Sequence, residues 1–182
     1  MGTSTNAILF YGYCWDDEEV SITSLLFPDF DEEVEETNDL EWQELIAIKR
    51  GFQNPWKNYP NAEIESLPYE ERRAATKRWT DDHQGELDEW YELKRAIDSE
   101  FGIEISTHCS SECAMPYVYV VESEITAIRG TPEELNLGVF TGQLDLGKDW
   151  DGKMQRFINE LGIITPEAQH HPRWWLVSDW SW

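Results

Sequence analysis

Segments with the composition of β-strands stand at both ends of the chain and in its middle, and this arrangement constrains the fold most. Residues 6–15 and 173–182 join β-branched and aromatic types in short runs, as do residues 103–107, 117–121 and 125–128. Helix-favouring stretches separate the middle group of segments from the segment at each end. The order predicts an α+β fold, with one mostly antiparallel sheet of about four to six strands and helices packed on it.

Apolar side chains occupy both faces of residues 6–13 and 117–121, so both segments are predicted to be buried strands. The three middle strands follow one another closely, with Glu122 to Glu124 joining the last two. We therefore expect an antiparallel meander. In the last strand, one face carries Trp174, Leu176, Trp180 and Trp182 and the other carries Trp175 and Val177.

Four helical stretches are predicted between the strands. One covers residues 40–50, with Asn38 as N-cap and Gly51 as its end, and residues 52–68 after it read as a loop. Residues 69–101 form a second helical stretch, split at Gly85, whose apolar stripe is Trp79, Leu87, Trp90, Ile97 and Phe101. Thr131, Pro132 and Glu134 form a capping box that begins a short helix. The last covers residues 150–161, with Met154, Phe157, Ile158 and Leu161 on one face and Gly162 as its end.

A single domain over residues 1–182 is predicted, because the length and a 40% hydrophobic content supply one core. Residues 16–37 form an acidic segment that we expect to be irregular and mobile. It holds Leu25, Leu26 and Phe27, through which we expect it to pack while its carboxylates stay solvated.

The charge is strongly negative and uneven. The chain has 37 acidic and 14 basic side chains, a net charge of −23, and the 48 residues before Lys49 hold 13 acidic side chains and no basic one. Direct nucleic-acid binding is disfavoured, because neutralising phosphates needs Lys and Arg. Binding to an anionic membrane surface is disfavoured for the same reason.

The three cysteines, Cys14, Cys109 and Cys113, are too few for a disulfide framework. Reduced thiols in the cytoplasm fit best, and neither a signal peptide nor a membrane-spanning run is visible. A tetrahedral zinc site needs four ligands, which the sequence HCSSEC from His108 to Cys113 does not supply. We expect no metal and no other cofactor.

Catalytic signatures are missing as well. The chain contains no Walker A, Rossmann, zinc-protease or nucleophile-elbow motif, so no catalytic residue is assigned. A cysteine nucleophile at Cys109 needs a positioned base, and the sequence does not rank His83, His108, His170 and His171 for that role. The sequence favours a non-enzymatic function, and a small enzyme with a site near His108 and Cys109 is the alternative.

Acidic clusters and terminal tryptophans are the candidate binding residues. Clustered carboxylates steer association with basic surfaces, and exposed Trp residues anchor interfaces. The residues selected on this basis are Asp16, Asp17, Glu18, Glu19, Asp31, Glu32, Glu33, Glu35, Trp180 and Trp182.

Four strings together resemble a group of small proteins of unknown function encoded by actinobacteria and their phages. They are NAILFYGYCWDDE, GIEISTHCSSECAMPYVYVV, ITAIRGTPEEL and PRWWLVSDWSW, in this order along the chain. The resemblance implies a phage or prophage origin and action in the cytoplasm of an infected host cell. It implies no activity and no catalytic residue.

These features lead to one functional expectation. The chain is predicted to be an acidic interaction protein that binds a host or defence protein through a basic surface, as an inhibitor or as a mimic of nucleic acid. A structural or virion-associated component, assembled through the Trp-rich end, is the third possibility. The oligomeric state is left open.

Overall fold

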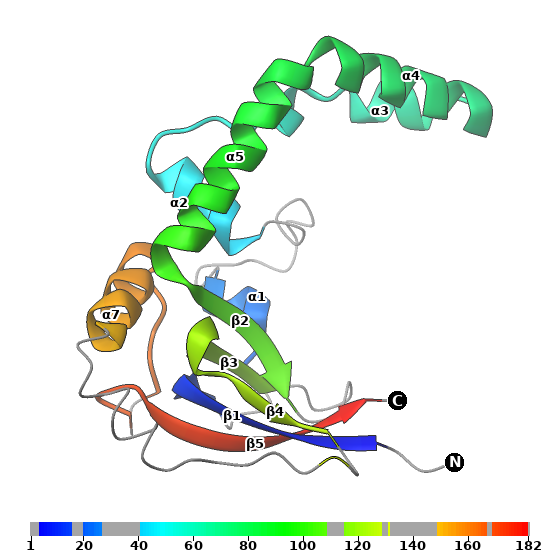
Figure 1. The fold of residues 1–182 in the computed structure, drawn as a ribbon. Coiled ribbons are helices and arrows are strands. Elements are labelled where there is room, and N and C mark those ends of the chain that lie inside the picture. The colour runs from blue at the N-terminus through cyan, green and yellow to red at the C-terminus, as the bar shows by residue number, and fades with distance from the viewer. Residues whose placement is uncertain are drawn as a thin grey trace. The chain divides into compact units, whose positions relative to one another are not determined.

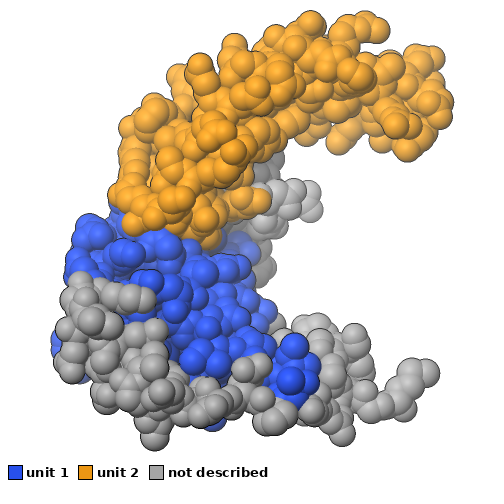
Figure 2. Space-filling model, viewed as in Figure 1, with its two compact units in different colours: residues 1–39, 101–182 blue, residues 40–100 orange. Residues whose placement is uncertain are grey.

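The computed structural model of the protein describes residues 4–15, 20–26, 41–108, 115–128, 131, 149–166 and 169–181. They belong to two compact units, one made of residues 1–39 and 101–182 and the other of residues 40–100 (Figure 2). We call them the sheet unit and the helical unit. The predicted α+β class with one antiparallel sheet is confirmed, and within the described residues the sheet has five strands.

Strand β1 (Ser4–Cys14) is the centre of the sheet (Figure 1). Along one edge it pairs with β5 (Arg173–Ser181) over nine residues, from Ser4 opposite Ser181 to Gly12 opposite Arg173. Along the other edge it pairs with β3 (Met115–Val120) and β4 (Ile125–Ala127), and β2 (Ile103–His108) pairs with β3. All pairings are antiparallel. The predicted buried strands are confirmed at residues 6–13 and 117–120, whereas Val121, predicted as a strand residue, is exposed and begins the 3-10 helix after β3.

The predicted meander is wrong in its last step, because β4 pairs with β1 and not with β3. A short 3-10 helix (Val121–Ser123) turns the chain so that β3 and β4 follow each other along the same edge of β1. Ser123 fixes this turn: its buried hydroxyl accepts from Tyr11 N at 2.9 Å and donates to Val120 O at 2.5 Å. One side chain therefore joins the turn to the middle of β1 between the two pairings.

Both faces of the sheet are apolar. On one face Phe10 stacks on Tyr117 with 4.3 Å between ring centroids, within a buried cluster that includes Ile8 and Cys14. The opposite face carries Tyr11, whose ring lies 5.6 Å from that of Trp150 in helix α7 (Trp150–Leu161). The predicted face of α7 is confirmed, because Met154, Phe157, Ile158 and Leu161 are all buried and Gly162 ends the helix at φ 80°.

Helix α1 (Ile22–Leu26) lies in the segment that was predicted to be irregular. Ser21 and Ser24 explain it, since each backbone N–H bonds the other residue's hydroxyl, at 2.9 and 3.0 Å, which caps the first turn. Leu25 and Leu26 are buried, as predicted. Phe27, the remainder of the acidic segment and the predicted capping box at Pro132 and Glu134 lie outside the described residues.

The helical unit holds α2 (Trp42–Lys49), a 3-10 helix (Pro55–Asn58), α3 (Asn61–Glu65), α4 (Tyr69–Asp82) and most of α5 (Gln84–Phe101). The N-cap of α2 is Glu41, not Asn38 as predicted, and the residues expected to form a loop contain two short helices. Of the predicted apolar stripe, Leu87, Trp90, Ile97 and Phe101 are buried on α5.

The break between α4 and α5 falls at His83, not at the predicted Gly85. The His83 ring stacks on Trp79 at 4.3 Å, and its Nδ1 lies 2.9 Å from Trp79 O at the end of α4. Gly85 falls in the first turn of α5, where helical N–H groups lack intrahelical partners in any case. A glycine is therefore tolerated there without ending the helix.

Candidate functional site

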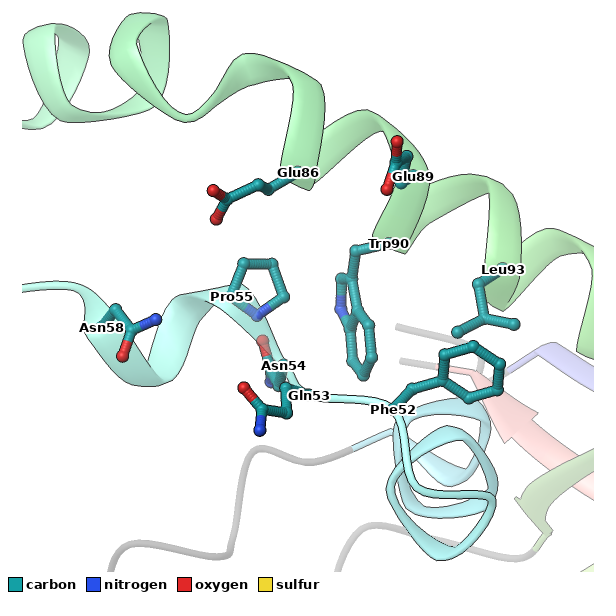
Figure 3. Close-up of a pocket in the computed structure, with 9 residues that line it drawn as sticks. All are labelled: Phe52, Gln53, Asn54, Pro55, Asn58, Glu86, Glu89, Trp90 and Leu93. Carbon is teal, nitrogen blue, oxygen red and sulfur yellow. The ribbon is translucent and has the colours of Figure 1, made fainter.

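The described helical unit contains a pocket of about 290 Å³, formed by two stretches of chain (Figure 3). Helix α5 contributes Glu86, Glu89, Trp90 and Leu93, which share one helical face because they stand at i, i+3, i+4 and i+7. The segment after α2 contributes Phe52, Gln53, Asn54, Pro55 and Asn58. In this segment Asn54 Oδ1 caps the 3-10 helix by accepting from Trp56 N at 2.9 Å.

Trp90 gives the pocket its distinctive chemistry. Its side chain is 3% exposed, and its indole Nε1 is the one buried side-chain nitrogen or oxygen in the described part of the chain that has no hydrogen-bond partner. In Figure 3 this nitrogen lies on the edge of the ring that faces Pro55 and Asn54. A buried donor without an acceptor is unfavourable, so it is rarely retained without a reason.

Charge at the pocket has one sign. Glu86 and Glu89 are exposed at its rim, and none of the described residues that line it is basic. The Glu86 side chain extends over the pocket toward Pro55 (Figure 3). The pocket therefore combines an unpaired neutral donor buried in its wall, aromatic surface from the exposed ring of Phe52, and negative charge at its opening.

A second constellation lies in the sheet unit, where Cys14 Sγ and His108 Nε2 are 3.3 Å apart. Cys14 pairs with Tyr117 and Tyr117 with Ser106, so Cys14, Ser106 and His108 project from one face of the sheet. Buried Gln169 makes two hydrogen bonds to the backbone of Cys14: its Oε1 accepts from Cys14 N at 3.4 Å, and its Nε2 donates to Cys14 O at 2.6 Å. The pair has the composition of a thiol nucleophile beside a base.

Sequence reasoning selected His108 but not its thiol partner. Cys109, which the sequence analysis named beside His108 without pairing the two, lies outside the described residues, and the thiol beside the His108 ring is that of Cys14, 94 positions away. Only the pairing of β1, β3 and β2 brings the two together. Of the other histidines, His83 stacks within the helical unit, and His170 and His171 are exposed.

Two buried tyrosines beside carboxylates are held protonated. Burial and the hydrogen bond from Tyr11 Oη to Asp151, at 2.6 Å, raise the pKa of Tyr11. Burial raises the pKa of Tyr119 as well, together with Glu124 and with Glu104, which accepts from its hydroxyl at 3.0 Å. Because the pKa of each tyrosine is raised, both hydroxyls stay protonated near neutral pH and donate to these carboxylates.

The predicted acidic binding residues cannot be placed. Asp16, Asp17, Glu18, Glu19, Asp31, Glu32, Glu33, Glu35 and Trp182 lie outside the described residues. Trp180 belongs to β5, where it pairs with Thr5, and its side chain is likewise outside the description. The sequence does assign the charge to the two units: the sheet unit has 23 acidic and 5 basic side chains, and the helical unit has 14 acidic and 9 basic ones.

Clusters of metal-ligating side chains and membrane-spanning helices are both absent from the described residues. No group of three or more His, Cys, Asp or Glu side chains there is arranged to hold a metal ion. None of the helices in this part of the chain combines the length and apolarity needed to cross a bilayer.

Comparison with known proteins gives no relative. Family models, curated proteins and solved structures were each compared with the chain, and none of them matches it.

Proposed function

We propose that the protein is an acidic interaction protein that binds a protein partner through a basic surface on that partner. The distribution of charge carries this proposal. The sheet unit has a net charge of −18, and 11 of its acidic side chains lie in residues 1–39 without a basic one. A field of one sign speeds encounter with basic surfaces.

The resemblance to actinobacterial and phage proteins adds the biological setting to this proposal. The partner is then a host or defence protein, met in the cytoplasm of the infected cell, and binding inhibits it or mimics nucleic acid. The acidic segment supplies steering, and the Trp-rich end of the chain supplies apolar anchors, because screening at physiological salt limits the reach of charge to about 8 Å.

Charge reversal tests the proposal on a partner captured from host lysate. Changing Asp31, Glu32, Glu33 and Glu35 to Lys is expected to slow association about tenfold at low salt and to flatten its salt dependence. The control is the same change to Lys at four exposed positions of the helical unit, which alters the net charge equally. These positions are Glu63, Glu65, Glu70 and Asp82. Equal association rates for the two variants would contradict a local role for the acidic segment.

Trp180→Ala separates anchoring from steering. We expect this change to accelerate dissociation and to leave the association rate nearly unchanged, because desolvated contacts form late in binding. An unchanged dissociation rate would remove Trp180 from the interface.

The second candidate function is thiol chemistry at Cys14, which the 3.3 Å contact with His108 Nε2 favours. Transfer of the thiol proton to the imidazole would leave a thiolate, the reactive form of cysteine. In a Cys109→Ser, Cys113→Ser background, His108→Ala is then expected to slow alkylation of Cys14 by iodoacetamide about tenfold near neutral pH. His171→Ala is the control, since His171 is exposed, and equal rates in both variants would exclude His108 as the base.

A further inference from the structure

We propose that the pocket on α5 binds a basic residue of a protein segment, whose main-chain carbonyl accepts from Trp90 Nε1 and whose cationic side chain lies at Glu86 and Glu89. This inference rests on the proposed function for the class of partner. It adds the chemistry of the contact and places it on the helical unit.

The acceptor follows from the buried indole. Trp90 Nε1 has no acceptor within the described residues, although its ring is packed to 3% exposure beside the pocket. A ligand oxygen that reaches it gains a hydrogen bond and removes the cost of an unpaired donor. An anionic oxygen is disfavoured because both charged rim residues are carboxylates, so a neutral amide carbonyl fits best.

The positive charge of the ligand side chain is inferred from the rim and the walls of the pocket. Glu86 and Glu89 present negative charge with no basic side chain among the pocket residues. The exposed ring of Phe52 lines the same space, and aromatic faces attract guanidinium and ammonium groups. Arginine suits this setting especially, since its planar group both stacks on rings and pairs with carboxylates.

The volume of the pocket fits a single residue of the partner. Its volume of about 290 Å³ lies at the small end of ligand-binding cavities. An extended segment can insert a single side chain and its adjoining carbonyl into such a space, whereas a folded element cannot. The occupant is therefore a loop or a flexible segment of the partner.

The direct test observes the indole N–H itself by NMR. The protein has ten tryptophans, and the Nε1 resonance of Trp90 is the one that disappears in Trp90→Phe. Titration with N-acetyl-arginine-N-methylamide is expected to move that resonance saturably. The citrulline analogue, which has the same shape without the charge, is expected to bind about 3- to 10-fold more weakly at low salt.

Charge removal supplies matched variants on one helix. Glu86→Gln with Glu89→Gln is expected to weaken binding of the arginine compound to the level of the citrulline compound. Asp88→Asn with Glu92→Gln removes two charges from α5 outside the pocket and is expected to leave binding unchanged. Equal affinity for the two compounds, or equal effects of the two double variants, would overturn the cationic specificity.

Two outcomes separate this inference from the proposed function. If the Trp90 resonance stays fixed throughout the arginine titration, the pocket inference fails, while salt-dependent binding of the captured partner would still support the proposed function. In the other outcome the resonance moves as expected, but reversing the charges of the acidic segment does not change the partner's association rate. The pocket then remains a site for basic residues, and the steering proposal fails.

Discussion

At the scale of single residues, Trp90 and Trp150 form a natural comparison. Both are buried, at 3% and 1% exposure, but Trp150 Nε1 donates to Glu122 at 2.5 Å, whereas Trp90 Nε1 has no partner in the described residues. Trp150→Phe therefore removes a hydrogen bond, whereas Trp90→Phe removes an unpaired donor.

We therefore expect Trp150→Phe to lower the free energy of unfolding by about 2 kcal/mol more than Trp90→Phe. Urea unfolding of the two variants measures the difference. Equal losses would mean that the Trp90 N–H has an acceptor in the free protein, which would also weaken the case for the pocket.

The buried tyrosines predict a loss of stability at alkaline pH. The pKa of Tyr119 is raised in the folded state by burial and by Glu104 and Glu124, so above pH 10 the folded state keeps a proton that the unfolded state loses. Its contribution to stability is complete below the unfolded pKa and falls by up to about 1.4 kcal/mol per pH unit above it. Tyr119→Phe should flatten this decline in urea unfolding at pH 9 to 11, and an unchanged slope would show that other groups cause it.

At the scale of elements, the close pairing of β1 with β3 depends on Gly12. A Cβ atom at this position would overlap the carbonyl oxygen of Val118 and crowd the backbone of Tyr119, and neither can move without opening the strand pair. Gly12 O also accepts from Trp175 Nε1 at 3.0 Å, which ties β5 to the same point.

Gly12→Ala is therefore expected to cost about 3 kcal/mol or more of folding stability. Gly85→Ala is the control, because a Cβ atom there meets nothing within 4 Å and alanine favours the helix. Thermal unfolding should show a large loss for the first variant and a small gain for the second. Similar stability of the Gly12 variant and the unchanged protein would contradict the strand packing.

Local patterns predicted the elements but not how distant elements meet. The apolar spacing of Met154, Phe157 and Leu161 defines α7 without help from other residues, and alternation defines β5 equally well. The pairing of β4 with β1 depends on where one 3-10 turn directs the chain, and the buried hydroxyl of Ser123 carries no signal in a local pattern.

The candidate sites were harder to predict for the same reason. Trp90 was predicted to lie on an apolar stripe and does so, but its unpaired N–H depends on Phe52 to Asn58, which were predicted only as a loop. Cys14 and His108 meet across an intervening strand. Such contacts depend on register between strands, which a single sequence does not specify.

At the scale of the whole molecule, charge and contact chemistry are divided between the two units. Most of the negative charge belongs to the sheet unit, and the pocket with its unpaired donor belongs to the helical unit. Long-range charge mainly raises association rates, whereas desolvated contacts mainly lower dissociation rates. Steering is therefore expected chiefly from the sheet unit, and one specific anchor from the helical unit.

Electrostatic steering is tested by measuring how the association rate of the unmodified protein with its captured partner depends on ionic strength. Between about 0.01 and 0.15 M salt the screening length falls from about 30 to about 8 Å, so we predict a fall in association rate of at least about tenfold. The dissociation rate should change far less over the same range. An association rate that stays constant across this range would show that the negative charge serves solubility alone, and would contradict the proposed function.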